Sequence, residues 1–319
     1  MAALFITEDE VRDLLDMETA IEVVEQAFVA LAEGTAVNVP RTRAFAPGPF
    51  FLHTMSASAD YLGVAGWKNY SSRPGHVEFL VGLYSIESGE LLALIEADYL
   101  GQLRTGAASG VATDYMARPD SKVVGVFGTG KQARTQLKAV CETRKIDYVE
   151  VYSRNDENRC RFADEMSELC NTEVEPVHAP DTAATEKDIV ITATGSSAPV
   201  FDGRVLDEGT HLNVVGSNFL QKTEIDVTTV RRADVIACDS IAQCQLEAGD
   251  FSAALTEHAI DWPLMHELSA IVTGRNTGRP QNESVTLFKS TGLAIEDVAL
   301  AAKLLELATK ERIGKPLPF

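Results

Sequence analysis

The 319-residue sequence is poor in features that indicate disulfides, metal sites or membrane spans. Its five cysteines are odd in number, scattered and free of C-x-x-C spacing, and its six histidines show neither H-E-x-x-H nor Cys/His spacing. No apolar run is long enough to cross a bilayer, and the N-terminal stretch turns acidic at once, without a basic and then apolar leader. The sequence therefore predicts a cytoplasmic protein with neither metal nor membrane partner.

Positive charge is also scarce. Lys and Arg number 28 against 47 Asp and Glu, which gives a formal net charge of −19. Nucleic acid and anionic membranes would repel such a chain, so neither is an expected partner, and we interpret the charge as favouring solubility. With 45% hydrophobic residues, a chain of this length can bury a large core and is expected to form two domains.

A glycine turn dominates the middle of the chain. The β-branched run 123–127 ends at Gly128 and Gly130 and leads into a helical stretch, residues 132–140, which is typical of a dinucleotide-binding βαβ unit. Gly128 permits the sharp turn, and Gly130 lets a pyrophosphate approach the unpaired N–H groups of the helix start. Ala133 is the small residue that allows close helix–strand packing.

Two alternatives exist for this turn. Gly125 to Lys131 has the form G-x-x-x-x-G-K of a nucleoside-triphosphate loop, but Gln132 follows it and supplies no hydroxyl for magnesium. Gly125 also lies inside the apolar run, where the strand should continue. A turn that binds nothing is the other alternative, and we favour the dinucleotide.

The residues before this turn predict a smaller α+β domain. Thr7 with Glu10 has the form of a capping box, and Asp16 begins a longer helix with an apolar stripe. A helix rich in small residues, 99–116, is expected to pack closely against another element. Between them, a mostly antiparallel sheet is predicted from strands at 42–45, 50–56, 63–69, 77–85 and 91–96.

After Arg118-Pro119, strands and helices alternate, which predicts a Rossmann-type doubly wound parallel sheet. We therefore expect an α/β protein with a substrate-binding and dimerisation domain at 1–118, a dinucleotide domain at 119–290, and a C-terminal helix, within 291–319, that joins the first domain. The strands expected in the dinucleotide domain are 123–127, 148–152, 174–177, 188–192, 211–215, 235–239 and 285–288.

The end of the second strand indicates which dinucleotide binds. An NAD site usually has Asp or Glu there, whereas an arginine with hydroxyl partners accommodates a 2′-phosphate. Here the residues are Ser153-Arg154-Asn155, so NADP(H) is favoured over NAD(H), with Asp156 as the residue that would reverse the preference. A plain surface arginine is the alternative interpretation of Arg154.

Cations stand where strands should be apolar. Arg41, Arg43 and Lys68 fall in or beside the first-domain strands, and Lys68 adjoins Trp67. A guanidinium fork holds a carboxylate well, and a nearby lysine can polarise an imine or carbonyl, or move a proton if burial lowers its pKa. Surface salt bridges are the alternative, more so for Arg43 than for Lys68.

These motifs together resemble the ornithine cyclodeaminase/mu-crystallin family, which includes amino-acid and imino-acid dehydrogenases. They run in family order over nearly the whole chain. They are Pro40-Arg41-Thr42, Gly66-Trp67-Lys68, Arg104-Thr105-Gly106-Ala107, Gly128-x-Gly130-x-Gln132-Ala133, Val215-Gly216-Ser217-Asn218, Lys222-x-Glu224-Ile225-Asp226 and Phe288-Lys289-Ser290-x-Gly292.

The resemblance implies a homodimer in which Arg41, Lys68 and Arg104 line the substrate pocket for a small amino or imino acid. It also implies that the turn at Arg104 and Thr105 approaches the cofactor phosphates. The cofactor-binding residues expected from the motifs are Thr105, Gly128, Thr129, Gly130, Gln132, Ala133, Ser153, Arg154, Asn155, Ala193, Thr194 and Gly216.

Asn218 separates two chemistries. Cyclodeaminases of the family place an aspartate at this position, and an amide cannot take up a proton at neutral pH. We therefore expect reversible hydride transfer between NAD(P)H and a small 2-imino or 2-oxo acid, by an amino-acid dehydrogenase or ketimine reductase. The alternatives are a cyclising ammonia lyase with internally recycled NAD, for which Asp226 is a substitute acid, and a protein that binds cofactor and ligand without turnover.

Overall fold

The computed structural model describes residues 2–318, which form two compact units. The first comprises the described residues up to Arg104 and those from Leu293 onward, and the second comprises Thr105–Gly292. The units divide within helix α3 (Asp98–Met116), earlier in the chain than the boundary expected after residue 118. Helix α10 (Ala294–Glu311) belongs to the first unit, so this unit is built from both ends of the chain.

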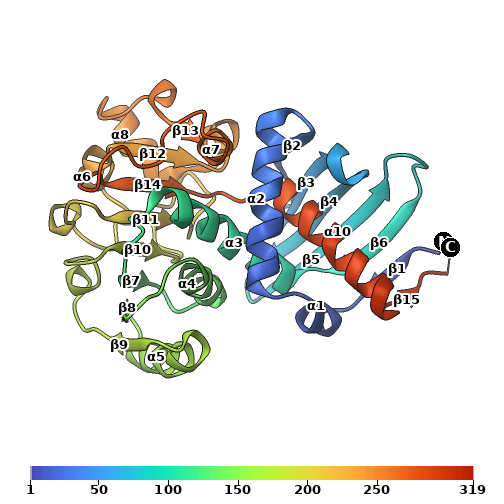
Figure 1. Ribbon diagram of the computed structural model, residues 1–319, viewed down its shortest axis with the longest axis horizontal. Helices are drawn as coiled ribbons and strands as arrows, with labels where there is room; N and C mark the ends of the chain where they lie inside the picture. The colour runs from blue at the N-terminus through green and yellow to red at the C-terminus, as the bar shows by residue number, and fades with distance from the viewer. Residues whose placement is uncertain (1, 319) are drawn as a thin grey trace. The chain divides into compact units, whose positions relative to one another are not determined.

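A seven-stranded sheet forms the first unit, in the order β15-β1-β6-β5-β4-β3-β2 (Figure 1). Strands β2 to β6 are antiparallel, as predicted, whereas β1 runs parallel to β6. The pattern missed β1 and β15, which are too short to show an alternation. The strands are β1 Leu4–Ile6, β2 Ala36–Phe45, β3 Phe51–Ala59, β4 Val64–Arg73, β5 His76–Ser85, β6 Leu91–Glu96 and β15 Lys315–Pro316.

Helices α1 (Glu8–Leu14), α2 (Met17–Glu33) and α10 complete this unit, and α10 packs against β2 to β5 and against α2. The predicted caps are present. The Thr7 backbone N–H donates to Glu10 Oε2 at 2.7 Å, and Asp16 Oδ1 accepts from the Thr19 N–H at 2.8 Å. These bonds satisfy donors that a helix start leaves unpaired, so the sequence itself fixes where both helices begin.

Eight parallel strands form the sheet of the second unit, in the order β13-β12-β14-β11-β10-β7-β8-β9. This is the predicted doubly wound sheet, and its order reverses between β7 and β10, where such sheets bind ligands at the carboxyl ends of the strands. The strands are β7 Val123–Phe127, β8 Tyr148–Tyr152, β9 Glu173–Pro176, β10 Ile189–Thr192, β11 His211–Val214, β12 Val235–Cys238, β13 His266–Glu267 and β14 Thr286–Lys289.

Helices cover both faces of this sheet. One face packs a core that includes Leu137 and Phe162 beneath α4 and α5, and the other packs a core that includes Phe127, Leu212 and Phe251. The helices are α4 Lys131–Thr143, α5 Asp156–Cys170, α6 Val227–Arg232, α7 Ile241–Glu247, α8 Ser252–Thr256 and α9 Leu268–Val272. Within residues 2–318, no helix combines the length and apolarity that a membrane crossing requires.

Candidate active site

The glycine turn after β7 has the geometry expected of a diphosphate cradle. Gly128 has φ +106°, a conformation that favours glycine, and a Cβ there would clash with the carbonyl of Ala193. Gly130 is the N-cap of α4, and a Cβ there would meet no atom within 4 Å. The space above Gly130 is therefore open, and the N–H groups at the start of a 13-residue helix face an approaching anion.

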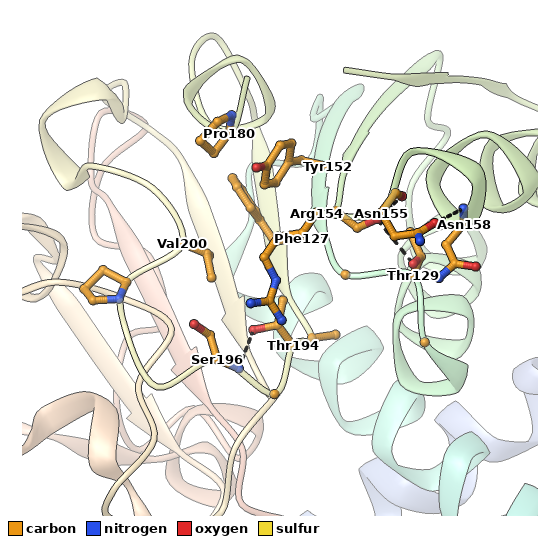
Figure 2. A pocket seen from close by; sticks show the side chains of 16 residues that line it. Phe127, Thr129, Tyr152, Arg154, Asn155, Asn158, Pro180, Thr194, Ser196 and Val200 are labelled. Carbon is orange, nitrogen blue, oxygen red and sulfur yellow. Dashed lines mark hydrogen bonds between the residues drawn. The ribbon is translucent and has the colours of Figure 1, made fainter. Parts of the chain in front are cut away.

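A cavity of about 520 Å³ opens beside this turn, at the carboxyl ends of β7, β8 and β10 (Figure 2). It lies where the strand order reverses, which is the ligand site of doubly wound sheets. Eight of the predicted cofactor residues line it, namely Gly128, Thr129, Gly130, Ser153, Arg154, Asn155, Ala193 and Thr194.

The other four predicted cofactor residues do not line this cavity. The carbonyl of Thr105 accepts a hydrogen bond from Gln136 Nε2 at 2.8 Å, and Gly216 donates its N–H to Glu224 Oε2 at 2.7 Å. Ala133 is buried in the core beneath α4, as its packing role predicts, and Gln132 is half-buried in the first turn of that helix. Their contacts with a cofactor remain predictions.

Several residues of the cavity wall were not predicted. Phe127 and Tyr152 end neighbouring strands in register, with their ring centroids 6.2 Å apart, and Pro180, Pro199 and Val200 add apolar surface. The signal for the two aromatic residues was present, because both are the last residues of strands that the sequence predicted. This wall gives one side of the cavity an apolar surface that suits a planar base.

The end of the cavity beside the C-terminus of β8 is where the sequence predicted the choice between NAD and NADP. It contains an arginine and amides but no carboxylate among its described lining residues. Arg154 is an exposed residue, and its side chain extends along the cavity toward Thr194 (Figure 2). Asn155 Oδ1 caps α5 by accepting from the Asn158 N–H at 2.8 Å. Asp156, the residue that would reverse the cofactor preference, accepts a hydrogen bond from Arg159 and does not line the cavity.

One buried carboxylate, which was not predicted to belong to the site, supports the cavity loops. Glu224 accepts from the Thr194 N–H at 2.6 Å, from Thr192 Oγ1 at 3.0 Å and from the Gly216 N–H at 2.7 Å. It thereby ties the loop after β10 to the loop after β11. Burial, and next the Asp250 carboxylate, raise the pKa of Glu224 above that of an ordinary carboxyl group.

Lys289 supports Glu224 from β14. Its Nζ lies 2.7 Å from Asp250 Oδ2 and donates to the Ser217 carbonyl at 2.9 Å, while Asp250 Oδ1 accepts from the Glu224 N–H at 2.6 Å. Burial lowers the pKa of Lys289, but the Asp250 and Glu224 carboxylates outweigh it and leave this pKa raised. We call Glu224, Asp250 and Lys289 the carboxylate brace. The sequence contained its signal in the motifs around Glu224 and Lys289, to which no structural role was given.

The two residues that bear on the alternative chemistry lie in loops of the second unit. Asn218 follows β11 and is half-buried, and its predicted role remains a prediction. Asp226 caps α6, because its carboxylate accepts from the Thr229 N–H at 2.7 Å and from the Gly203 N–H at 3.1 Å. These bonds give Asp226 a structural role.

In the first unit, strand register gathers the predicted cations. The β-bulge between Val39 and Thr42 interrupts the pairing of β2 with β3 at Arg41. Arg41, Lys68 and Arg104 are 6%, 2% and 7% exposed, so none of the three is the surface cation of the alternative interpretation. Two adjacent rows cross the sheet, one through Arg43, His53, Tyr70 and Phe79, the other through Met55, Lys68 and Val81.

Lys68 is a buried ammonium with one carboxylate partner. Its Nζ donates to Asp297 Oδ1 at 2.7 Å and lies 5.2 Å from the centroid of the Phe79 ring. Burial, together with the smaller effects of Arg104 and Arg41, lowers the pKa of Lys68 to about 8, against the opposing effect of Asp297. The lowered pKa is the condition under which the sequence predicted that this lysine moves a proton.

Arg104 is held by two neighbouring acids of α10. Its Nη1 lies 2.8 Å from Glu296 Oε2 and its Nε lies 3.2 Å from Asp297 Oδ1, and both acids are buried. Burial opposes the charge of Arg104, but Asp297 and Glu296 outweigh burial and raise its pKa. Neither acid was predicted to belong to the site, although two adjacent carboxylates in an apolar helix were a visible signal. We call Arg41, Lys68, Arg104, Glu296 and Asp297 the cation cluster.

His53 was also missed. It is buried and stacks on Tyr70, with ring centroids 4.0 Å apart and an interplanar angle of 6°. Burial, and to a smaller extent Arg43 and then Arg41, lower the pKa of His53 to about 4. At neutral pH this histidine is therefore uncharged. Arg43 pairs with His53 in the register of β2 and β3 and is half-buried, so it is not the fully exposed cation of the alternative interpretation.

Comparison with known proteins places this geometry among related chains. Residues 1–312 match the ornithine cyclodeaminase/mu-crystallin family. A Δ1-pyrroline-2-carboxylate reductase of Bacillus cereus is 33% identical over 99% of this chain and 100% of its own. A solved Δ1-pyrroline-2-carboxylate reductase of Thermococcus litoralis, in complex with NADH and L-proline, is 37% identical with a TM-score of 0.94, covering 98% of this chain and 100% of its own. An archaeal alanine dehydrogenase dimer with bound NAD is 33% identical with a TM-score of 0.94, and the match covers both chains completely.

Proposed function

Because this chain belongs to the ornithine cyclodeaminase/mu-crystallin family, we propose that it is a nicotinamide-dependent oxidoreductase of small 2-imino acids, with a cyclic 2-imino acid as its preferred substrate. One observation carries the proposal. A buried lysine with a pKa near 8 lies among arginines in the first unit, and this combination can bind a carboxylate and give a proton to the neighbouring nitrogen. Relatives that reduce a cyclic imino acid support the ring-closed substrate.

The second unit fits the dinucleotide. The open cradle at Gly130 and the start of α4 would hold the diphosphate, and the apolar wall beside Phe127 would hold the adenine. We propose that Arg154 and Ser153 bind a 2′-phosphate, so that NADPH is preferred over NADH. When bound, the nicotinamide supplies a hydride in reduction and accepts one in oxidation.

The cation cluster supplies the remaining chemistry. Arg41 and Arg104 bind the substrate carboxylate and thereby fix the position of the imine carbon. Lys68 gives a proton to the imine nitrogen, so that one hydride and one proton convert the C=N bond into an amine. In oxidation the neutral Lys68 takes the proton back. A lysine with a pKa near 8 populates both forms close to physiological pH, which suits a reversible reaction.

The test is to offer the protein a panel of substrates and to monitor each reaction by the loss of NAD(P)H absorbance. Five- and six-membered cyclic 2-imino acids should be reduced fastest, ahead of 2-oxo acids with ammonia, and NADPH should be used in preference to NADH. Absence of turnover across the panel with both cofactors would contradict the proposal. Ornithine serves as the control for the lyase alternative, because cyclodeamination forms product without net change in NAD(P)H.

We further propose that the protein is a homodimer that pairs through the sheet of the first unit. Large apolar side chains are exposed on β2, β3 and β5, which is unusual for a surface that stays in water. The related alanine dehydrogenase is a dimer. Sedimentation should give twice the 34.5 kDa chain mass, and a monomer would contradict the proposal. The exposed residues are Val37, Val39, Phe45, Leu52, Val77 and Tyr84.

A further inference from the structure

We propose that Asp297 is the positioning residue for Lys68: from the final helix it orients the lysine ammonium and stabilises its charged form. The inference rests on the proposed function, in which Lys68 is the proton donor. It assigns a role in the reaction to a helix whose sequence predicted only packing. The contacts that support it join β4, α3 and α10 and lie entirely within the first unit.

One carboxylate oxygen serves both cations. Asp297 Oδ1 accepts from Lys68 Nζ at 2.7 Å and from Arg104 Nε at 3.2 Å, and the carboxylate is fully buried. Because two donors approach one oxygen, the relative position of the ammonium and the guanidinium is set by this atom. Asp297 therefore controls the spacing between the group that donates the proton and a group that binds the substrate carboxylate.

A structural role for Asp297 as a helix-start acid is the competing explanation. Acids in the first turn of an 18-residue helix interact favourably with its dipole, and both Glu296 and Asp297 lie there. Their side chains, however, bond to cations on β4 and α3, and a carboxylate that served only the helix start would remain in solvent or bond to N–H groups of α10. These directed contacts indicate a role beyond capping.

The charges around Lys68 come from several elements. Arg41 on β2 and Arg104 on α3 lower the pKa of Lys68, in addition to burial, whereas Asp297 on α10 raises it. Strand β5 contributes the Phe79 ring, and β3 contributes Met55 opposite Lys68 and His53 one row away, which is neutral at pH 7. Loss of the Asp297 charge should therefore lower the pKa of Lys68 below 8.

The consequence for the reaction follows from the protonation state. Reduction needs the ammonium of Lys68, so its rate should fall as pH rises through the pKa of this group. If Asp297 loses its charge, the fall should begin at lower pH. Oxidation needs the neutral amine of Lys68, so in this variant the rate of oxidation should begin to rise at a lower pH than in the unaltered enzyme.

The experiment compares the pH dependence of reduction in the full-length enzyme, its Asp297→Asn variant and a matched control, Glu296→Gln. Both acids are adjacent and buried on the same helix, and Glu296 contacts Arg104. We expect Asp297→Asn to move the high-pH limb of kcat downward by about one unit or more. Glu296→Gln should instead raise KM and leave the limb in place. Asp297→Glu, which keeps the charge, should return the limb toward its original position.

Three outcomes decide the inference. A folded Asp297→Asn enzyme with an unmoved limb, or an equal movement in Glu296→Gln, would overturn it while leaving the proposed function intact. If the unaltered enzyme has no turnover, the proposed function fails. In that case the role of Asp297 is tested by measuring the pKa of Lys68 by NMR in protein with isotope-labelled lysines. The Lys68 signal is assigned by its absence in Lys68→Arg. An unchanged titration in Asp297→Asn or, should that variant not fold, in Asp297→Ser, which also lacks the carboxylate charge, would overturn the inference as well.

Discussion

Two buried lysines, one in each unit, have the same carboxylate distance and opposite properties. Lys68 and Lys289 each place Nζ 2.7 Å from a buried aspartate, Asp297 and Asp250 respectively. Yet the pKa of Lys68 falls to about 8 by burial, assisted by two arginines, whereas two carboxylates outweigh burial and raise the pKa of Lys289. The comparison teaches that the sign of the neighbouring charges, rather than burial, separates a lysine that can release its proton from one that holds the fold together.

Removing the first lysine should have the largest effect on the reaction. Lys68→Ala should lower kcat for imine reduction by about 10³-fold, because the proton donor is lost. The dissociation constant for NADPH should stay within about twofold, since Lys68 does not line the dinucleotide cavity. Steady-state kinetics with cofactor fluorescence titration measure both quantities. An unchanged kcat would remove Lys68 from the mechanism.

Removing the second lysine should chiefly affect the fold. Lys289→Met leaves the Asp250 carboxylate buried without its cation, and we expect the free energy of unfolding to drop by about 3 kcal/mol. Urea unfolding measures this loss. The double variant Lys289→Met/Asp250→Leu should regain part of it, because it removes one of the two buried carboxylates that the lysine charge offsets. A Lys289→Met protein as stable as its parent would mean that the two lysines differ less than we infer.

The carboxylate brace offers a change of intermediate size. Glu224→Gln keeps the shape of the side chain but loses charge-assisted bonds to the loops after β10 and β11. We expect about tenfold weaker NADPH binding, which corresponds to about 1.4 kcal/mol. Fluorescence titration measures this change, and kcat at saturating cofactor should change little. Wild-type affinity would show that the loops keep their geometry without the brace.

An exposed cation should have the smallest effect. Arg154→Ala should weaken NADPH binding about fivefold, corresponding to about 1 kcal/mol, because the 2′-phosphate loses its cation. The loss is small because water screens the charge of this exposed arginine. NADH binding should not change, since it lacks the 2′-phosphate. The ratio of the two dissociation constants measures the preference. Equal losses for both cofactors would indicate that Arg154 binds the diphosphate or the base instead.

The glycine turn, the parallel strands and the cations Arg41 and Lys68 could be located from local sequence, because each depends on residues near one another in the chain. The turn at Gly128 and Gly130 needs only a strand before it and a helix after it. Lys68 was recognisable because a cation is rare within an apolar run. Asn218 was recognised by its place in a motif, and its role is still a prediction.

The partners of these residues could not be found in the same way. Asp297 follows Lys68 by 229 positions, and Glu224 follows Thr194 by 30, so local pattern gives no information about either contact. Pairing of His53 with Tyr70 depends on the register between β3 and β4, which a strand pattern alone does not determine. The sequence therefore predicted the candidate active groups, and the tertiary structure was needed to find the groups that contact them.

The position of Asp297 in the chain has a consequence for biosynthesis. A ribosome completes the strand that carries Lys68 long before it makes helix α10, and the whole second unit is translated in the interval. During that time the first sheet has neither its covering helix nor the counter-ion for its lysine, so the newly made strands expose apolar surface and uncompensated positive charge. The nascent second unit can thus fold before the first, and Lys68 acquires its counter-ion only after the second unit has been made.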